Sequence, residues 1–212
     1  ILISSARTAR MRTPRIAPLP VAAWGAEETG ALRAYVGDAG VERFLSGAPD
    51  APRVPNVLGT LLRHPRIAAK WLPYNGTLLD RGTIEPRLRE LVILRVAART
   101  GSEYEWLQHV RIGRKLGITA DEFDAIRGAC DRTWPALEAD LLAATDELLD
   151  HHRVSDATWA RLAETLAPRQ LIELVFVVGS YACLAMVFES CGIELDPDLV
   201  DDPAPRIADR KT

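Results

Sequence analysis

The sequence predicts an all-α protein, built as a compact bundle of helices joined by short loops. From about Asn56 to Ile193, apolar residues recur at spacings of three and four, which is the period of a helix with one buried face. Pro, Gly and capping residues separate these stretches, and no stretch alternates with period two for long enough to predict a strand. With 212 residues, 48% of them hydrophobic, the chain can bury one core.

The helices are expected in a definite order along this region. Residues 56–64 and 65–79 form the first two, and a turn follows them at 80–83. Pro86 suits a first helical turn, and the residues after it are apolar nearly all round, which predicts a central helix. Glycines and a capping box at Thr119 delimit the helices that remain, expected at 87–99, 102–116, 119–129, 135–151, 155–166 and 168–191.

Three regions are expected: an N-terminal arm with a short helix at 1–53, the helical domain at 54–197, and an extended C-terminal tail at 198–212. The arm has arginines but no acidic residue in its first twenty positions. It lacks a continuous apolar segment, so it is not a signal peptide. We expect it to pack on a neighbouring surface, and an Arg-rich transit peptide is the alternative.

The composition excludes several classes of function. A net charge of −3 offers no excess of positive charge for phosphate backbones, so no nucleic acid is expected as a partner. The longest charge-free apolar run, residues 174–188, is shorter than the roughly 18 residues that span a bilayer, which predicts a buried core helix and no membrane. Three cysteines without a CxxC motif fit a reducing, cytoplasmic setting.

One histidine has no simple structural explanation. His64, His151 and His152 lie at predicted helix ends, where the terminal carbonyl groups account for them. No HxH or HExxH spacing occurs, so no structural metal is expected. His109, in contrast, lies in the middle of a predicted helix.

His109 belongs to a polar helix face. Ser102, Glu105 and His109 follow one another at spacings of three and four, so they share this face, and Tyr104 and Trp106 flank it. Only two residues connect this helix to the preceding one, so the two should form an antiparallel hairpin at the core. Glu90 then lies about 15 Å from the turn, at a depth similar to that of His109. The two side chains are predicted to meet and to line a pocket.

Structural roles could explain the same residues. Ser102 and Glu105 fit the S-x-x-E pattern of a capping box, which needs no catalysis. Glu90 could pair with Arg87 or Arg95, and His109 could be a hydrogen-bonded core histidine. The case for a site therefore depends on the combination of Glu90 with His109.

The central block resembles the carboxymuconolactone decarboxylase and alkyl hydroperoxidase D-like superfamily. The resemblance lies in residues 89–97, 101–106 and His109, with support from 117–122 and 192–195, and it covers about 54–197. The peroxidase branch has a glutamate, eleven residues, C-x-x-C or C-x-H-C, and a histidine four residues later. This sequence has Glu90 and His109 but places Ser102 and Glu105 at the cysteine positions, and Tyr104 at the position of the additional histidine.

This difference excludes a thiol peroxidase. Peroxide reduction of that kind needs a thiolate and a resolving thiol. Cys183 and Cys191 are eight residues apart on one predicted helix, about 12 Å along its axis, and cannot form a disulfide there. The sequence is therefore more similar to the branch without the CxxC motif.

The resemblance implies the alkyl hydroperoxidase D-like bundle and cofactor-free acid–base chemistry on a small oxygenated acid or lactone. Decarboxylation, isomerisation and lactone chemistry are the reactions it allows, with Glu90 and His109 as the proton relay. Glu105 and Tyr104 are further catalytic candidates, and Arg87 or Arg95 could hold an anionic substrate. The expected substrate-binding residues are Ser102, Trp106, Tyr74 and Tyr181.

The resemblance also implies a homo-oligomer: a dimer, trimer or hexamer. Apart from other copies, only a small-molecule substrate is expected as a partner. The alternative function is a catalytically inactive oligomeric binding or assembly protein of the same fold, and a redox partner that uses an external thiol ranks last.

Overall fold

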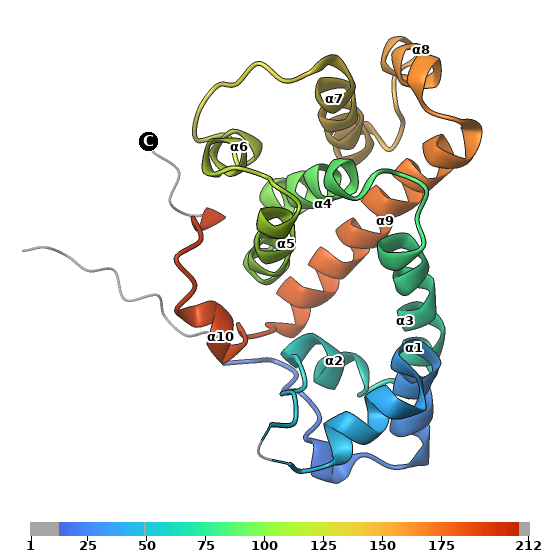
Figure 1. Cartoon of the computed structure of the whole chain (residues 1–212), viewed down its shortest axis with the longest axis vertical. Coiled ribbons are helices and arrows are strands. Elements are labelled where there is room, and N and C mark those ends of the chain that lie inside the picture. The colour runs from blue at the N-terminus through green and yellow to red at the C-terminus, as the bar shows by residue number, and fades with distance from the viewer. Residues whose placement is uncertain (1–12, 49, 208–212) are drawn as a thin grey trace, which may run out of the picture.

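The computed structural model describes residues 13–48 and 50–207, and within these ranges the chain forms helices, turns and loops but no strand (Figure 1). The all-α prediction is therefore confirmed. In chain order the elements are the 3₁₀ turn η1 (Val21–Ala23) and the helices α1 (Ala26–Leu45), α2 (Asn56–Leu61), α3 (Pro65–Asp80), α4 (Pro86–Thr100), α5 (Glu103–Lys115), α6 (Ala120–Ile126), α7 (Ala136–His151), α8 (Asp156–Thr165), α9 (Pro168–Cys191) and α10 (Pro197–Val200).

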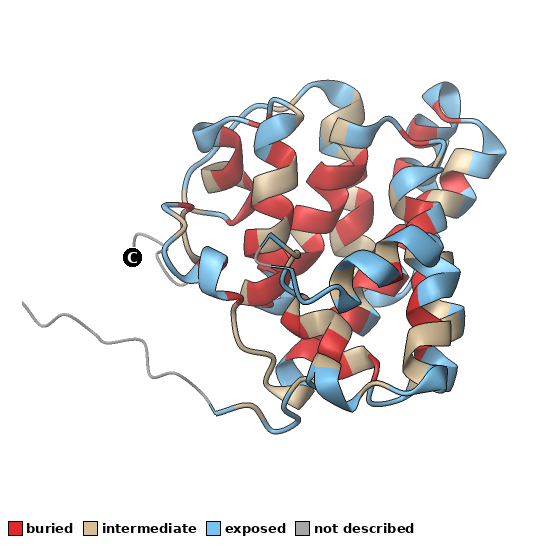
Figure 2. Ribbon diagram, turned by 60° about the horizontal axis from the view of Figure 1, so that its bottom comes forward, coloured by how far each residue is buried: buried red, intermediate tan, exposed pale blue. Residues whose placement is uncertain are grey.

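Helix α4 occupies the centre of the bundle, as its apolar sequence predicts. It packs against α5, α7 and α9, and the red segments of Figure 2 mark the buried core that these helices share. Leu91, Val92 and Leu94 are completely buried because every side of α4 has a helical neighbour. Pro86 begins the helix, and Gly101 ends it with φ at 75°, a left-handed conformation that glycine adopts without strain.

The predicted hairpin at the core is present. Helices α4 and α5 pack together, and the backbone N–H of Ser102 donates to Ala97 O at 3.0 Å, which closes the short turn. The capping box that opens α6 is confirmed too, because Thr119 and Glu122 each accept a hydrogen bond from the other's backbone N–H.

Helix α9 runs through the molecule as a core helix. It contacts α3, α4, α7 and α8, and Figure 1 shows it crossing behind α4. By length and composition α9 could span a membrane, but half of the residues in its most apolar stretch are buried inside the protein. Its one early carboxylate, Glu173, accepts hydrogen bonds from the backbone N–H groups of Thr83 and Ile84.

Helices α1 and α3 form a pair with a small apolar cluster of their own, built on residues such as Leu32, Leu62 and Leu72. At 20 residues, α1 is longer than the short helix expected in the N-terminal region, and it bends at Gly37. The pair is close because Gly76 has no side chain: a Cβ there would lie 2.8 Å from the Tyr35 ring.

Both ends of the described chain pack on the domain itself. The backbone N–H groups of Arg15 and Ile16 donate to Cys191 O, so this part of the arm contacts its own chain. After Asp196 the chain enters α10 rather than an extended tail, and Leu199 and Ile207 are buried. Arg7, Arg10 and Arg12 lie outside the described residues.

Candidate active site

A cavity of about 260 Å³ lies among α2, α3, α5 and α9. Its wall is mostly apolar, and the polar side chains that reach it come mainly from α3, α5 and α9. The lining residues are Tyr35, Pro55, Val57, Leu58, Leu61, Trp71, Leu72, Asn75, Leu79, Tyr104, Glu105, Gln108, His109, Tyr181, Leu184 and Phe188.

Glu90 and His109 meet at the inner wall of this cavity, as the spacing predicts. Glu90 Oε2 lies 2.6 Å from His109 Nδ1, and both side chains are buried. His109 lines the cavity, whereas Glu90 lies behind it, with Arg89 Nη2 at 3.5 Å from its other oxygen. No group among the described residues bonds to His109 Nε2, so this is the nitrogen that a bound molecule can use.

Tyr181 of α9 fixes the plane of the imidazole. The two rings pack edge to face, with centroids 5.0 Å apart and an interplanar angle of 87°. The Tyr181 hydroxyl and Oδ1 of Asn75 are buried and make no hydrogen bond of normal geometry, although the Asn75 side chain lies close enough to Tyr181 to lower the pKa of its phenol. Burial raises the pKa of Tyr181 well above its ordinary value, and the neighbouring Glu90 carboxylate adds to this shift.

Glu105 has no structural role in helix capping. Both of its carboxyl oxygens are buried without a partner, and Ser102 at the start of α5 makes no side-chain capping bond. The proposed capping box is therefore wrong. Burial raises the pKa of Glu105 well above its ordinary value, which favours the neutral carboxylic acid. One helical turn separates it from His109, so an acid and an imidazole face the same cavity.

Tyr104 lines the cavity but its hydroxyl group is already engaged. It donates to Asp196 Oδ2 at 2.6 Å, and Gln108 Nε2 donates to both the Tyr104 oxygen and Asp196 Oδ2. Burial raises the pKa of Tyr104, and the hydrogen bond to Asp196 raises it further. Tyr104 is therefore a neutral hydrogen-bonding residue in this arrangement.

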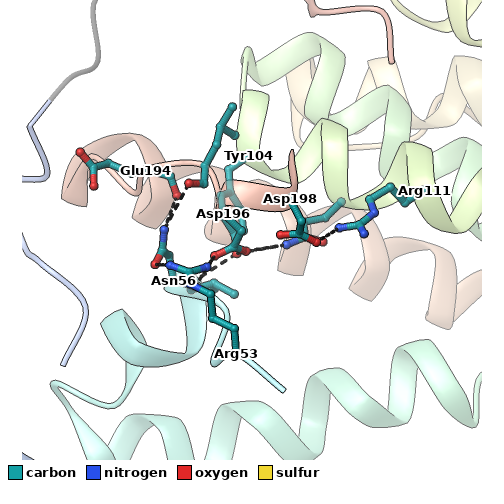
Figure 3. Close-up of polar contacts among 10 residues, drawn as sticks. Arg53, Asn56, Tyr104, Arg111, Glu194, Asp196 and Asp198 are labelled. Atoms are coloured by element: carbon teal, nitrogen blue, oxygen red, sulfur yellow. Dashed lines mark hydrogen bonds and ion pairs between the residues drawn. The ribbon is translucent and has the colours of Figure 1, made fainter. Parts of the chain in front are cut away.

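Asp196 joins three parts of the chain next to the cavity, as Figure 3 shows. Its Oδ1 accepts from Arg53 Nη1 at 2.6 Å and from the backbone N–H of Asn56 at 2.8 Å. Sequence reasoning missed this residue because it precedes Pro197 in an acidic segment that resembles a solvent-exposed tail. Asn75 and Gln108 were missed too, although each is a polar residue among apolar helix positions.

Five of the residues proposed for substrate contact or charge lie elsewhere. The indole of Trp106 packs on Phe123 and donates to Pro205 O, so the prediction that it lines the pocket is wrong. The Tyr74 hydroxyl bonds Ser180 Oγ on a partly exposed surface between α3 and α9. Ser102 is buried but does not line the cavity.

The two arginines proposed to hold an anion are also occupied elsewhere. Arg87 pairs with Glu122 and Glu138. Arg95 binds Asp146 through two hydrogen bonds. Neither arginine lines the cavity or pairs with Glu90. Across the part of the chain that the structure describes, no group of three His, Cys, Asp or Glu side chains could hold a metal ion.

Comparison with known proteins places the helical core in a family. Residues 65–147 match the carboxymuconolactone decarboxylase family. No curated protein sequence matches the chain. The fold is similar to that of a peroxidase-related protein from Silicibacter sp., at 12% identity and a TM-score of 0.71, covering 92% of this chain and 98% of that one.

Two further solved structures have the same fold. One is a peroxidase-related protein with an alkylhydroperoxidase AhpD core from Ralstonia eutropha, at 18% identity, with a TM-score of 0.67 over 89% of this chain and 96% of that one. The other is the debrominase Bmp8 in complex with 2,3,4-tribromopyrrole, at 14% identity, with a TM-score of 0.65 over 90% and 95%. The helical core at residues 65–147 thus matches the carboxymuconolactone decarboxylase family, and most of the chain has the fold of the alkyl hydroperoxidase D-like proteins.

Proposed function

We propose that the protein is a cytoplasmic, cofactor-independent acid–base enzyme that acts on a small oxygenated acid or lactone. The observation that carries this proposal is the 2.6 Å contact between Glu90 and His109 Nδ1, at the wall of a cavity that also contains the neutral acid Glu105. A buried carboxyl group with a raised pKa beside a hydrogen-bonded carboxylate–imidazole pair is an arrangement suited to paired acid and base catalysis.

The geometry supports a division of roles. Glu90 accepts a hydrogen bond from His109 Nδ1–H, which leaves Nε2 free to take a proton from a substrate carbon next to a carbonyl group. The Glu90 carboxylate then stabilises the imidazolium. Glu105 donates its proton in a hydrogen bond to the carbonyl oxygen, which stabilises the enolate. If the substrate has a β,γ double bond, the enolate is a dienolate, and return of the proton from Nε2 to its γ-carbon completes an isomerisation to the conjugated compound.

The cysteines support this acid–base function over thiol chemistry. Cys130 is exposed in the loop between α6 and α7, Cys183 is exposed on α9, and Cys191 is the last residue of α9. None of the three lines the cavity. The superfamily includes decarboxylase and debrominase enzymes, and the bromopyrrole bound by Bmp8 is also a small ring compound. These relatives support an enzyme of small molecules.

The test is an untargeted incubation of the protein with a cell-extract metabolite mixture, followed by mass spectrometry. We expect the wild type to change the amount of at least one small oxygenated compound. His109→Ala and Glu90→Gln should remain folded by circular dichroism and lose this activity, because each removes one member of the relay.

His151→Ala is the matched control, since His151 is exposed at the end of α7, away from the cavity. It should retain full activity. Activity that survives in His109→Ala would refute the relay. A folded wild type that changes no compound would favour the alternative, a catalytically inactive binding or assembly protein.

A further inference from the structure

The cavity has no cation in its wall. Its 16 lining residues include neither Arg nor Lys. The ionisable side chains among them are Tyr35, Tyr104, Tyr181, Glu105 and His109. The nearest buried cation, Arg89, faces Glu90 at 3.5 Å behind the wall. Among the described residues that line the cavity, neither an arginine nor a lysine is therefore present to neutralise a bound carboxylate.

A bound anion would also face unfavourable neighbours. Arg89 already balances the charge of Glu90, so with a neutral imidazole the Arg89–Glu90–His109 group offers a bound anion no net positive charge. Glu105 lies one helical turn from His109, and burial raises its pKa, so the surroundings of this group favour a neutral carboxyl over a carboxylate. A second carboxylate would lose its hydration there without an opposite charge to replace it.

The cavity nevertheless contains several polar groups that need partners. Both oxygens of Glu105, the hydroxyl of Tyr181 and Oδ1 of Asn75 are buried without a hydrogen bond. A neutral carboxyl and a phenol can donate, and the carboxyl and amide oxygens can accept. A molecule that satisfies them therefore needs both an acceptor, such as a carbonyl, and a donor, such as a hydroxyl or N–H group.

The size of the cavity limits the ligand. A dry apolar cavity of about 150 Å³ holds one benzene molecule, and this one measures about 260 Å³. The space suits a single ring that carries one or two small substituents. Apolar side chains on the remaining wall, such as Leu58, Leu72 and Phe188, suit the faces of such a ring.

From the missing cation, the unpaired polar groups and the volume, we infer that the ligand is an uncharged, ring-sized carbonyl compound that also carries a hydroxyl or N–H group. This narrows the proposed substrate from acids and lactones to the uncharged members of that range. This inference rests on the proposed function in one respect: it takes this cavity as the substrate-binding site.

A matched pair of probes tests the inference: benzamide and benzoate have the same ring and nearly the same shape, but only benzoate is charged at neutral pH. Binding to the full-length protein can be followed by ligand-observed NMR and titration calorimetry, at up to about 10 mM probe because such fragments bind weakly. We expect benzamide to bind at least about tenfold more tightly, because benzoate must be desolvated without a counter-ion. Benzoate binding that equals or exceeds that of benzamide would overturn the inference, and so would an absence of benzamide binding.

A pair of neighbouring variants shows whether binding occurs in this cavity. Tyr181→Phe removes only an unpaired hydroxyl, so the protein should remain folded while benzamide affinity falls about fivefold, the effect of one hydrogen bond. Ser180→Ala is the control, because its hydroxyl bonds Tyr74 outside the cavity. Equal benzamide affinity in the wild type and Tyr181→Phe would refute the assignment.

These measurements need no turnover, so the two proposals can fail separately. Preferential binding of benzamide by a protein that transforms no metabolite would refute the proposed function and leave the ligand class standing. Turnover of a carboxylate substrate that is lost in His109→Ala would support the proposed function and refute the inference that the ligand is uncharged.

Discussion

Glu105 is the residue whose environment departs most from what its sequence context suggests. Its position three residues after Ser102 predicts a capping role, yet its carboxyl group is buried beside the cavity without a partner. A carboxyl group that is buried without a hydrogen bond is costly when ionised, so its protonation state has consequences for stability as well as for catalysis.

The raised pKa of Glu105 makes folding stability depend on pH. In the unfolded chain the group has its ordinary pKa of 4.5, while in the folded protein burial raises the pKa. Above the unfolded value the native state binds the extra proton, so the free energy of unfolding falls as pH rises, by about 1.4 kcal/mol per pH unit at most.

Glu105→Gln should therefore be more stable than the wild type at neutral pH. Its advantage should grow between about pH 5 and pH 8, because the amide has no proton to lose. Urea unfolding of both proteins across this range measures the difference. A stability difference that does not change with pH would show that Glu105 is not held protonated.

At the scale of single residues, the sequence predicted the relay better than the pocket walls. Glu90 and His109 meet because a two-residue turn places them at equal depth on adjacent helices. Trp106 lies one position after Glu105, about 100° around the helix axis, and so it faces the C-terminal segment instead. Side-chain direction of this kind depends on which helix packs against which face.

At the scale of elements, α4 is the most sensitive part of the bundle, because its sides are covered by other helices. Leu91→Asp should unfold the protein, since it buries an unpaired charge at a position with no exposed surface. Ile67→Asp on α3 is the control, because Ile67 is 53% exposed and the change should cost less than about 0.5 kcal/mol. Thermal unfolding by circular dichroism distinguishes them, and a cooperative transition near the wild-type temperature in Leu91→Asp would contradict this account.

The junction between α9 and α10 depends on a single carboxylate. Asp196→Ala leaves Tyr104, Asn56 and Arg53 without their shared acceptor, so we expect a loss of about 2–3 kcal/mol. Hydrogen exchange should become faster at residues 193–207, where this segment is attached. Asp198→Ala removes only an exposed ion pair with Arg111 and should cost less than about 1 kcal/mol. Equal effects of the two changes would show that Asp196 does not anchor the segment.

Sequence periodicity predicted the helices and their ends but could not predict this junction. The bonds of Asp196 to Tyr104 and Asn56 join residues 92 and 140 positions apart. Helix periods and caps are local properties, whereas such pairings follow from how finished helices pack. The same limit explains why the short helix α10 was expected to be an extended tail.

At the scale of the whole molecule, the prediction of a homo-oligomer can be tested on α9. This helix exposes an apolar stripe at helical spacing, in which Ile172, Phe176 and Met186 are each more than half exposed. We expect copies of the chain to associate through it. Light scattering should report a species larger than the 23.3 kDa monomer.

Phe176→Asp should shift that species toward the monomer, because it places a charge in the expected contact. Trp159→Asp on α8 is the control, an exposed aromatic position away from the stripe, and it should leave the assembly unchanged. A wild type that is monomeric at micromolar concentration would end this prediction.

The residues that line the cavity come in equal numbers from two parts of the chain. Half of its lining residues fall within 65–147, the part that matches the family, and these include His109 and Glu105. The other half, with Val57, Leu58 and Tyr181 among them, comes from the segment before α3 and from α9. The proposed acid and base thus lie in the matched stretch with half of the wall, and the other half of the wall lies outside that stretch. Ligand preference could be redesigned through the outer stretches, by protein engineering or by evolution, while the acid and the base stay in place.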